Sequence, residues 1–353
     1  MKNVFVPHTQ YNLVISVALI EQQYKSDDNT LILFTDFAIS DSLKNFLSSY
    51  FTNVLFLPGT YPAINKKWSA KVKQIPNAID SMKALLKGKY NRLFWVCDTA
   101  VPEIWLLKDL HGKNEKLEIR WLEDGALPYF YNFATNTGLN KNSFTRSVRK
   151  CFGRMKFGKY YSYKDTNIIG SSKWNQEYCL TCPESVRSDF SDKPALKVED
   201  EYFKTAVKKI YDSCDCDIED DSVLILMDKL DVYKNIDSIS DAVKKIVDTS
   251  TLARKSIYYK YHPREESSLS VLNSCIQIPK TIGAEGIYAK NIGKKIKVIG
   301  IKSTGLQTAL KSGFKVASIA VMVKEDNLEL MSFYKSIGIE IVEKPDEIMR
   351  FLQ

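Results

Sequence analysis

The chain has 353 residues, of which 44% are hydrophobic, and a formal net charge of 50 − 42 = +8. This length favours two domains, and the moderate positive charge suits an anionic partner such as a phosphate, an acidic sugar or a membrane surface without indicating nucleic acid. No segment approaches the roughly 20 apolar residues of a membrane span, and the first apolar run is too short for a signal peptide.

The seven cysteines do not form a disulfide pattern, because an odd number cannot all pair within one chain. Cys179 and Cys182 have the spacing of zinc ligands or a redox pair, but no second ligand pair follows them. Cys214 and Cys216 have no histidine nearby. We therefore expect no bound metal and a reducing compartment, the cytosol.

Apolar runs alternate with helical patterns along the first third of the chain. The runs predict strands at 4–6, 30–35, 53–57, 92–97 and 117–122. The helical patterns lie at 11–24, 40–51 and 75–86. Continuous apolar strands separated by amphipathic helices indicate a buried parallel sheet with helices on both faces.

The middle of the chain is basic, with no acidic residue from 126 to 164. Lysines, arginines and apolar residues recur at helical spacing between 141 and 159, which predicts a basic amphipathic helix. This helix either presents an ordinary solvated face or contacts an anionic acceptor or anionic lipid. Residues 183–198 mix Pro, Ser, Asp and Lys without periodicity, and we interpret them as a linker.

A second α/β series follows. Its apolar runs predict strands at 222–227, 256–261, 274–278, 297–301 and 317–321, and its helical patterns lie at 201–212, 238–248, 306–310 and 345–352. The fold class is therefore α/β, with two doubly wound, Rossmann-like domains, 1–190 and 191–353, expected to face each other across a cleft. Ligands of such sheets lie off the carboxyl ends of the strands.

Glu123, Asp124 and Gly125 follow the strand predicted at 117–122. Adjacent carboxylates repel each other, so one pKa can rise, which suits a general base. Gly125 permits a tight turn and close approach of a substrate. The alternative is an acidic turn after an edge strand.

Lys260, His262 and Pro263 end the strand predicted at 256–261. Lys260 and His262 lie two residues apart, so on a strand they would face the same way and could meet a phosphate. Pro263 fixes the backbone there. The alternative is a surface histidine that caps a strand.

Ser303 and Thr304 begin the helix predicted at 306–310, where hydroxyls and free N–H groups bind anions, although both also cap helices generally. Glu285 could accept hydrogen bonds from two ribose hydroxyls, or it could simply stabilise the first turn of a helix. His8 follows the first strand, either facing the cleft or belonging to a capping loop.

Together these elements resemble the motifs of bacterial sialyltransferases with a GT-B fold. Their acidic-acidic-Gly, His-Pro and Ser-Ser or Ser-Thr motifs appear in that order, as Glu123-Asp124-Gly125, His262-Pro263 and Ser303-Thr304. Lys260 and Glu285 also match. The segment His8-Thr9-Gln10-Tyr11 resembles a Thr-Pro-Tyr-type loop of lipooligosaccharide sialyltransferases and polysialyltransferases, although here the Pro precedes the Thr.

The resemblance implies an inverting sialyltransferase that moves sialic acid from CMP-sialic acid to a hydroxyl of a lipopolysaccharide, lipooligosaccharide or capsule glycan. Domain 1–190 would bind the acceptor and carry the base, and domain 191–353 would bind CMP. Asp124 would be the base, supported by Glu123. His262 would be the third catalytic residue and would stabilise the departing phosphate. The roles in substrate and CMP binding would fall to Ser303, Thr304, Lys260, Glu285, His8, Pro263 and Gly125.

No cofactor or metal is implied, because cationic side chains and a helix N-terminus replace the metal. We expect a cytoplasmic enzyme, with a lipid-linked acceptor or the inner membrane as the partner of residues 141–159, and no nucleic acid. The alternatives are a GT-B enzyme with another donor, such as CMP-Kdo or a UDP-sugar, and a non-catalytic nucleotide- or glycan-binding protein. A nucleic-acid-binding role would leave the acids at the strand ends unexplained.

Overall fold

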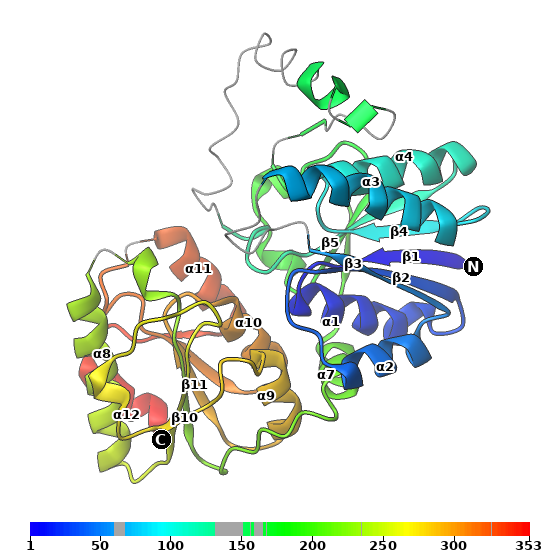
Figure 1. The fold of residues 1–353 in the computed structure, drawn as a ribbon. Helices are drawn as coiled ribbons and strands as arrows, with labels where there is room; N and C mark the ends of the chain where they lie inside the picture. The colour runs from blue at the N-terminus through cyan, green and yellow to red at the C-terminus, as the bar shows by residue number, and fades with distance from the viewer. Residues whose placement is uncertain are drawn as a thin grey trace. The chain divides into compact units, whose positions relative to one another are not determined.

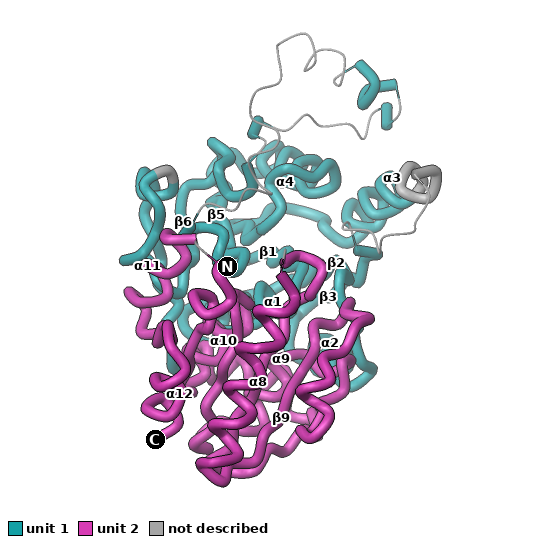
Figure 2. The backbone as a smooth tube through the Cα atoms, turned by 90° about the vertical axis from the view of Figure 1, so that its left-hand side faces the viewer, with its two compact units in different colours: residues 1–202 teal, residues 203–353 magenta. Residues whose placement is uncertain are grey.

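The computed structural model describes residues 1–59, 68–130, 151–155, 157–158, 165–166, 168–233, 235–325 and 327–353. These residues form two compact units, Met1–Tyr202 and Phe203–Gln353 (Figure 2). The sequence pattern places the division between residues 190 and 191. The structural division lies further along the chain because the short strand Ala195–Lys197 pairs with the first sheet.

The first unit is built on a parallel sheet of seven strands in the described part of the chain. In chain order they are β1 Lys2–Val6, β2 Asp28–Thr35, β3 Asn53–Pro58, β4 Arg92–Trp95, β5 Glu118–Leu122, β6 Glu177–Leu180 and β7 Ala195–Lys197. They lie side by side in the order β3-β2-β1-β4-β5-β6-β7. The chain therefore changes direction across the sheet between β1 and β4, and such a switch point is where doubly wound sheets bind ligands.

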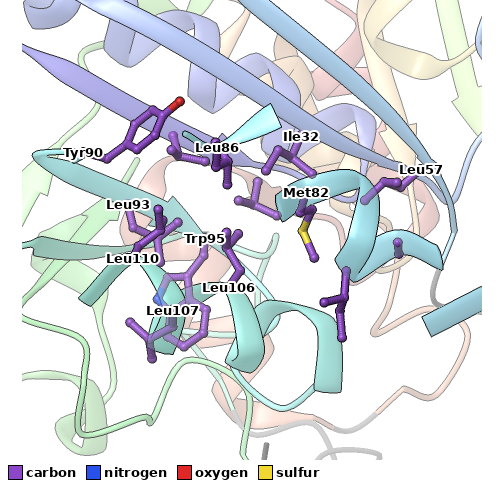
Figure 3. Packing of buried hydrophobic residues seen from close by; sticks show 14 of the residues in the cluster. Ile32, Leu57, Met82, Leu86, Tyr90, Leu93, Trp95, Leu106, Leu107 and Leu110 are labelled. Atoms are coloured by element: carbon purple, nitrogen blue, oxygen red, sulfur yellow. The ribbon is translucent and has the colours of Figure 1, made fainter. Parts of the chain in front are cut away.

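Helices cover both faces of this sheet (Figure 1). Figure 1 shows α1 and α2 on one face and α3 and α4 on the other. Their bounds are α1 Gln10–Leu19, α2 Asp41–Tyr50, α3 Trp68–Leu85 and α4 Val101–Lys113. Met82 of α3 and Leu106 and Leu110 of α4 pack with Ile32 and Trp95 of the strands in one buried cluster (Figure 3). This core fixes the strands whose ends carry the polar residues described below.

The local sequence explains where α1 begins. Thr9 Oγ1 accepts the N–H of Asn12 at 3.2 Å, and the Asn12 side chain accepts the N–H of Thr9 at 3.1 Å. This reciprocal pair is a capping box, which satisfies two backbone donors at the helix start. From Tyr11 to Leu19 every residue of α1 is buried, and the helix continues as a π-helical turn, η1 Ile20–Tyr24. The capping box thus holds the loop between β1 and α1 in a defined position.

The second unit repeats the plan with six parallel strands among its described residues. The strands are β8 Val223–Leu226, β9 Ile257–Lys260, β10 Ile276–Gln277, β11 Lys297–Gly300, β12 Lys315–Ser318 and β13 Glu340–Ile341. Their order is β10-β9-β8-β11-β12-β13, so the switch point lies between β8 and β11. The fold class, α/β with two doubly wound sheets, is therefore confirmed.

Six helices accompany the second sheet in the described chain. They are α7 Asp200–Ile210, α8 Ile236–Leu252, α9 Ala284–Asn291, α10 Thr304–Lys311, α11 Leu328–Ile337 and α12 Pro345–Leu352. Helix α7 lies where the two units divide. In Figure 1, α8 and α12 lie together on one face and α9 and α10 on the other, and each pair is in contact. None of the described helices combines the length and the apolar character needed to cross a membrane.

The linker prediction for residues 183–198 is wrong. The segment contains two 3₁₀ turns, Pro183–Ser185 and Ser188–Phe190, and then β7. Phe190 is buried with Trp121 and Tyr178 in a small cluster, so the segment belongs to the first unit. Its lack of periodicity reflects short elements, because a three-residue edge strand cannot display an alternating pattern.

Other elements were missed or displaced. The sequence pattern did not predict α4, β6, α11 or β13. The strand expected at 317–321 lies at Lys315–Ser318, because the buried apolar residues Ile319 and Ala320 follow the strand in a turn. The helix expected from residue 75 begins earlier, at Trp68.

Candidate active site

Glu123 is enclosed at the carboxyl end of β5 and is fully buried. Its Oε2 accepts hydrogen bonds from the Tyr129 hydroxyl and the backbone N–H of Thr181, both at 2.5 Å. Its Oε1 accepts from the Thr181 hydroxyl at 3.0 Å and from the Tyr11 hydroxyl. Burial raises the pKa of Glu123, and these donors oppose the rise. Because four donors occupy its oxygens, Glu123 supports its neighbours and is poorly placed to take a proton from a substrate.

Asp124, the next residue, is partly exposed. Burial raises its pKa, while the Asn12 side chain and the charge of His8 oppose the rise. The following Gly125 has φ = 55°, the left-handed conformation that glycine adopts without strain. A partly exposed carboxylate with a raised pKa at a strand end has the properties of a general base.

Both ring nitrogens of His8 face carboxylates. Nδ1 lies 3.1 Å from Asp36, after β2, and Nε2 lies 2.7 Å from Glu103, in the first turn of α4. The ring also stacks on Phe34, with 4.7 Å between centroids. Burial alone would lower the pKa of His8, but the two acids outweigh it and raise the pKa to about 9. His8 is therefore a buried imidazolium at the switch point of the first sheet, and its side chain is 1% exposed. The expected contact between His8 and a substrate stays a prediction.

Asn12 connects the backbone of His8 with the backbone of Glu123. Its side-chain oxygen accepts from the backbone N–H of His8 at 3.4 Å and from the Thr9 hydroxyl at 2.8 Å. Its amide nitrogen donates to the backbone carbonyl of Glu123 at 2.7 Å. Asn12 was not predicted from the sequence, because the usual capping-box residue three positions after a Thr is Glu or Gln.

In the second unit, Asp228 follows β8 at the switch point. Its Oδ2 accepts from the Tyr233 hydroxyl at 2.6 Å and from the backbone N–H of Lys302, after β11, at 3.0 Å. Burial raises the pKa of Asp228, while Tyr233, Lys302 and His262 favour its charged form. Asp228 was also missed, although its position directly after a buried strand matches that of Asp124.

His262, just after β9, has a defined tautomer when neutral. Its Nδ1 accepts the backbone N–H of Arg264 at 3.1 Å, so in the neutral ring the proton lies on Nε2. Burial and the neighbouring cations Arg264 and Lys260 lower the pKa of His262, and Asp228 partly opposes them. The side chain is partly exposed and its Nε2–H can donate to an anionic oxygen, whereas Pro263 is exposed.

Ser303 and Thr304 begin α10, as predicted from the sequence. Ser303 is the N-cap, and its Oγ accepts the N–H of Gly305 at 3.1 Å. Thr304 is the exposed first residue of the helix. A helix N-terminus of this kind, beside Lys302, has the chemistry that anion binding requires.

Lys260 and Glu285 are buried together in the second unit, 5% and 9% exposed. The Lys260 ammonium donates to the carbonyl of Tyr261 at 3.2 Å, and burial lowers its pKa. Glu285 lies in the first turn of α9, where burial raises its pKa and Lys260 opposes the rise. The two charges therefore act on each other.

Most of the basic stretch 141–159 lies outside the described residues. Its described part includes a helical turn, 151–155, in which Phe152 and Met155 are 63% and 70% exposed. The role of this stretch stays a prediction. Among the described residues no cluster of three or more His, Cys, Asp or Glu side chains has the arrangement of a metal site.

Solved structures share this architecture. The GT-B domain of a sialyltransferase from Photobacterium damselae matches with 13% identity over 97% of each chain and a TM-score of 0.50. UDP-GlcNAc 2-epimerases from Methanocaldococcus jannaschii and Neisseria meningitidis match with TM-scores of 0.54 and 0.52. Their identities are 12% and 15%, with 100% and 99% of this chain and 92% and 90% of theirs covered. Two parallel sheets of this topology, shared with these structures, thus define a GT-B fold.

Residues 3–316 match the model of the alpha-2,8-polysialyltransferase family. The chain belongs to this family and is a glycosyltransferase of the sialyltransferase type. No curated protein matches its sequence. The resemblance inferred from the short motifs is therefore confirmed, while the roles of the individual residues stay predictions.

Proposed function

We propose that the protein transfers sialic acid from CMP-sialic acid to a hydroxyl of a bacterial surface glycan with inversion at the anomeric carbon. The observation that carries this proposal is the chemical contrast between two strand ends. Asp124 is a partly exposed acid with a raised pKa, and His262 presents an Nε2–H next to cationic groups. The first suits proton removal, and the second suits an anionic leaving group.

In the proposed reaction, Asp124 accepts the proton of the acceptor hydroxyl as that oxygen forms a bond to the anomeric carbon. The bond from this carbon to the phosphate oxygen of CMP breaks in the same step, and CMP leaves with the electron pair. Negative charge grows on the phosphate, where the Nε2–H of His262 and the N-terminus of α10 at Ser303 and Thr304 stabilise it. No metal takes part in this scheme.

The family name supports an acceptor that itself carries sialic acid, because an alpha-2,8 polymer grows on sialic acid. Such an acceptor is anionic, in keeping with the net charge of +8. We place the basic stretch 141–159 at this acceptor or at an anionic membrane surface. Lipopolysaccharide, lipooligosaccharide and capsule remain the candidate glycans, and the protein would act in the cytoplasm.

A donor panel tests the proposal. The wild-type protein is incubated with CMP-sialic acid, CMP-Kdo or UDP-GlcNAc, each with sialylated and galactosylated acceptors, and free sugar and transferred sugar are measured. We expect turnover with CMP-sialic acid alone. His262→Ala should lower it about 100-fold or more, the usual effect of losing a donor to a developing charge. His111→Ala, at a histidine of α4 whose ring meets Trp174, should leave turnover unchanged.

Turnover of CMP-Kdo or a UDP-sugar in place of CMP-sialic acid would show that the donor is wrong. Binding of CMP without turnover of any donor would indicate a non-catalytic nucleotide-binding protein.

A further inference from the structure

Helix α9 and the chain just after α7 approach each other closely at Gly286. A β-carbon at this position would lie 2.9 Å from Sγ of Cys214 and 3.6 Å from Cδ1 of Tyr211. The first distance is shorter than a β-carbon tolerates, so the approach depends on glycine. The ring of Tyr211 lies at ordinary contact distance from the same position, beside the turn of α9 that contains Glu285.

The Tyr211 hydroxyl is buried and has no hydrogen-bond partner among the described residues. Buried tyrosine hydroxyls usually find a partner, because an unpaired one has lost its hydrogen bonds to water. Burial and the charge of Glu285 raise the pKa of Tyr211 well above its ordinary value, so the phenol keeps its proton. Tyr211 is therefore an unused donor close to a buried acid.

Glu285, in turn, has few donors. The interactions that favour its charged form are a hydrogen bond from its own backbone N–H and the charge of Lys260. The Lys260 ammonium is directed to the carbonyl of Tyr261 at 3.2 Å. An ionised carboxylate that is 9% exposed needs further hydrogen bonds to stay charged. The Tyr211 hydroxyl, which feels the charge of Glu285 and has no partner among the described residues, is a candidate for such a bond.

We propose that Tyr211 is a positioning residue, which donates a hydrogen bond to the Glu285 carboxylate when nucleotide binds and directs that carboxylate to the ribose hydroxyls. The inference rests on the proposed function, which assigns nucleotide binding to the second unit. Tyr211 acts through Glu285 and does not itself need to touch the ligand. Its effect should therefore appear only with ligands that carry the ribose hydroxyls.

This dependence gives a sharp test. The affinities of the full-length protein for CMP and for 2′,3′-dideoxy-CMP are measured by titration calorimetry. Tyr211→Phe should bind CMP about tenfold more weakly than wild type, the usual loss for one hydrogen bond to a charged group, and should bind the dideoxy nucleotide equally well. Tyr259→Phe is the matched control, since it removes a hydroxyl that donates to Gln277 at 3.1 Å in the same unit, and it should change neither affinity.

A second variant leaves the phenol in place. Gly286→Ala inserts a β-carbon that would clash with Sγ of Cys214 and press on the ring of Tyr211, so it disturbs this contact and should weaken binding of CMP more than binding of the dideoxy nucleotide. Unchanged CMP affinity in Tyr211→Phe, or an equal loss for both nucleotides, would overturn the inference.

The nucleotide preference of the wild-type protein distinguishes a failure of the Tyr211 inference from a failure of the proposed donor. If wild type prefers UDP to CMP, the donor is wrong, and the same comparison with UDP and its dideoxy form decides the role of Tyr211. If wild type binds no nucleotide, both proposals fall.

Discussion

His8 lies between Asp36 and Glu103, and its buried ring carries a positive charge at neutral pH. This arrangement links stability to pH. Because the folded pKa of about 9 exceeds the ordinary value of 6.5, the stabilisation is fully present below pH 6.5 and is lost as the pH rises to 9. The difference corresponds to about 3 kcal/mol of unfolding free energy.

Urea unfolding at pH 6 and at pH 9.5 measures this loss. The paired variant His8→Gln with Glu103→Gln replaces the ion pair by neutral amides of similar shape. Wild type should lose about 3 kcal/mol more than the paired variant between the two pH values. Equal losses in the two proteins would mean that His8 is neutral in the folded state.

The role of each residue was harder to predict from the sequence than its position. Glu123, Asp124, His262 and Ser303 follow strands as expected, because apolar runs ending in polar residues mark strand ends clearly. The burial of His8 and its acidic partners was not predictable, because Asp36 and Glu103 meet it only through the strand order β2-β1-β4. Tyr211 gave no sequence signal, because the role proposed for it depends on its contact with α9 at Gly286.

At the scale of elements, Glu123 ties the end of β5 to two of its neighbours. Tyr11 belongs to α1 and Thr181 follows β6, and both donate to the same carboxylate. Glu123→Gln keeps the shape but places an amide N–H₂ against donors that need an acceptor. We expect a loss of about 2 kcal/mol in unfolding free energy, because buried donors are left unpaired.

Glu118→Gln is the matched control for this prediction, at the start of the same strand. The Glu118 side chain is 46% exposed and pairs with Arg92 and Arg120, so its loss should cost less than about 1 kcal/mol. Chemical denaturation of both variants gives the comparison. Equal stabilities of the two variants would show that the donors around Glu123 do not hold β5, β6 and α1 together.

Length did not decide which helices were predictable, because α12, with eight residues, was predicted while α4 and α11, with 13 and 10 residues, were missed. Helix α12 begins and ends where its sequence pattern predicts, because Pro345 occupies the first turn and apolar residues recur at helical spacing. Helix α4 was missed, although Pro102 lies in its first turn in the same way. Strands β7 and β13, of three and two residues, are too short for a pattern, so the neighbouring strands define them.

At the scale of the whole molecule, one chain builds the same type of sheet twice. In each, the strand order reverses around the first strand, and polar residues gather at the carboxyl ends. The sequence was sufficient to predict this class, because two series of buried parallel strands and their helices are long and regular. It could not identify the strand order or the segment that adds β6 and β7, because these depend on contacts between distant segments.

The central claim is that the first unit supplies the base and the second unit binds the nucleotide. The most direct measurement is the turnover number of Asp124→Asn for transfer from CMP-sialic acid, together with its affinity for CMP. We predict that turnover falls about 100- to 10,000-fold, the usual effect of losing a general base, while CMP affinity stays within about twofold of wild type. Turnover close to that of wild type, or a loss explained by weaker CMP binding, would contradict the account.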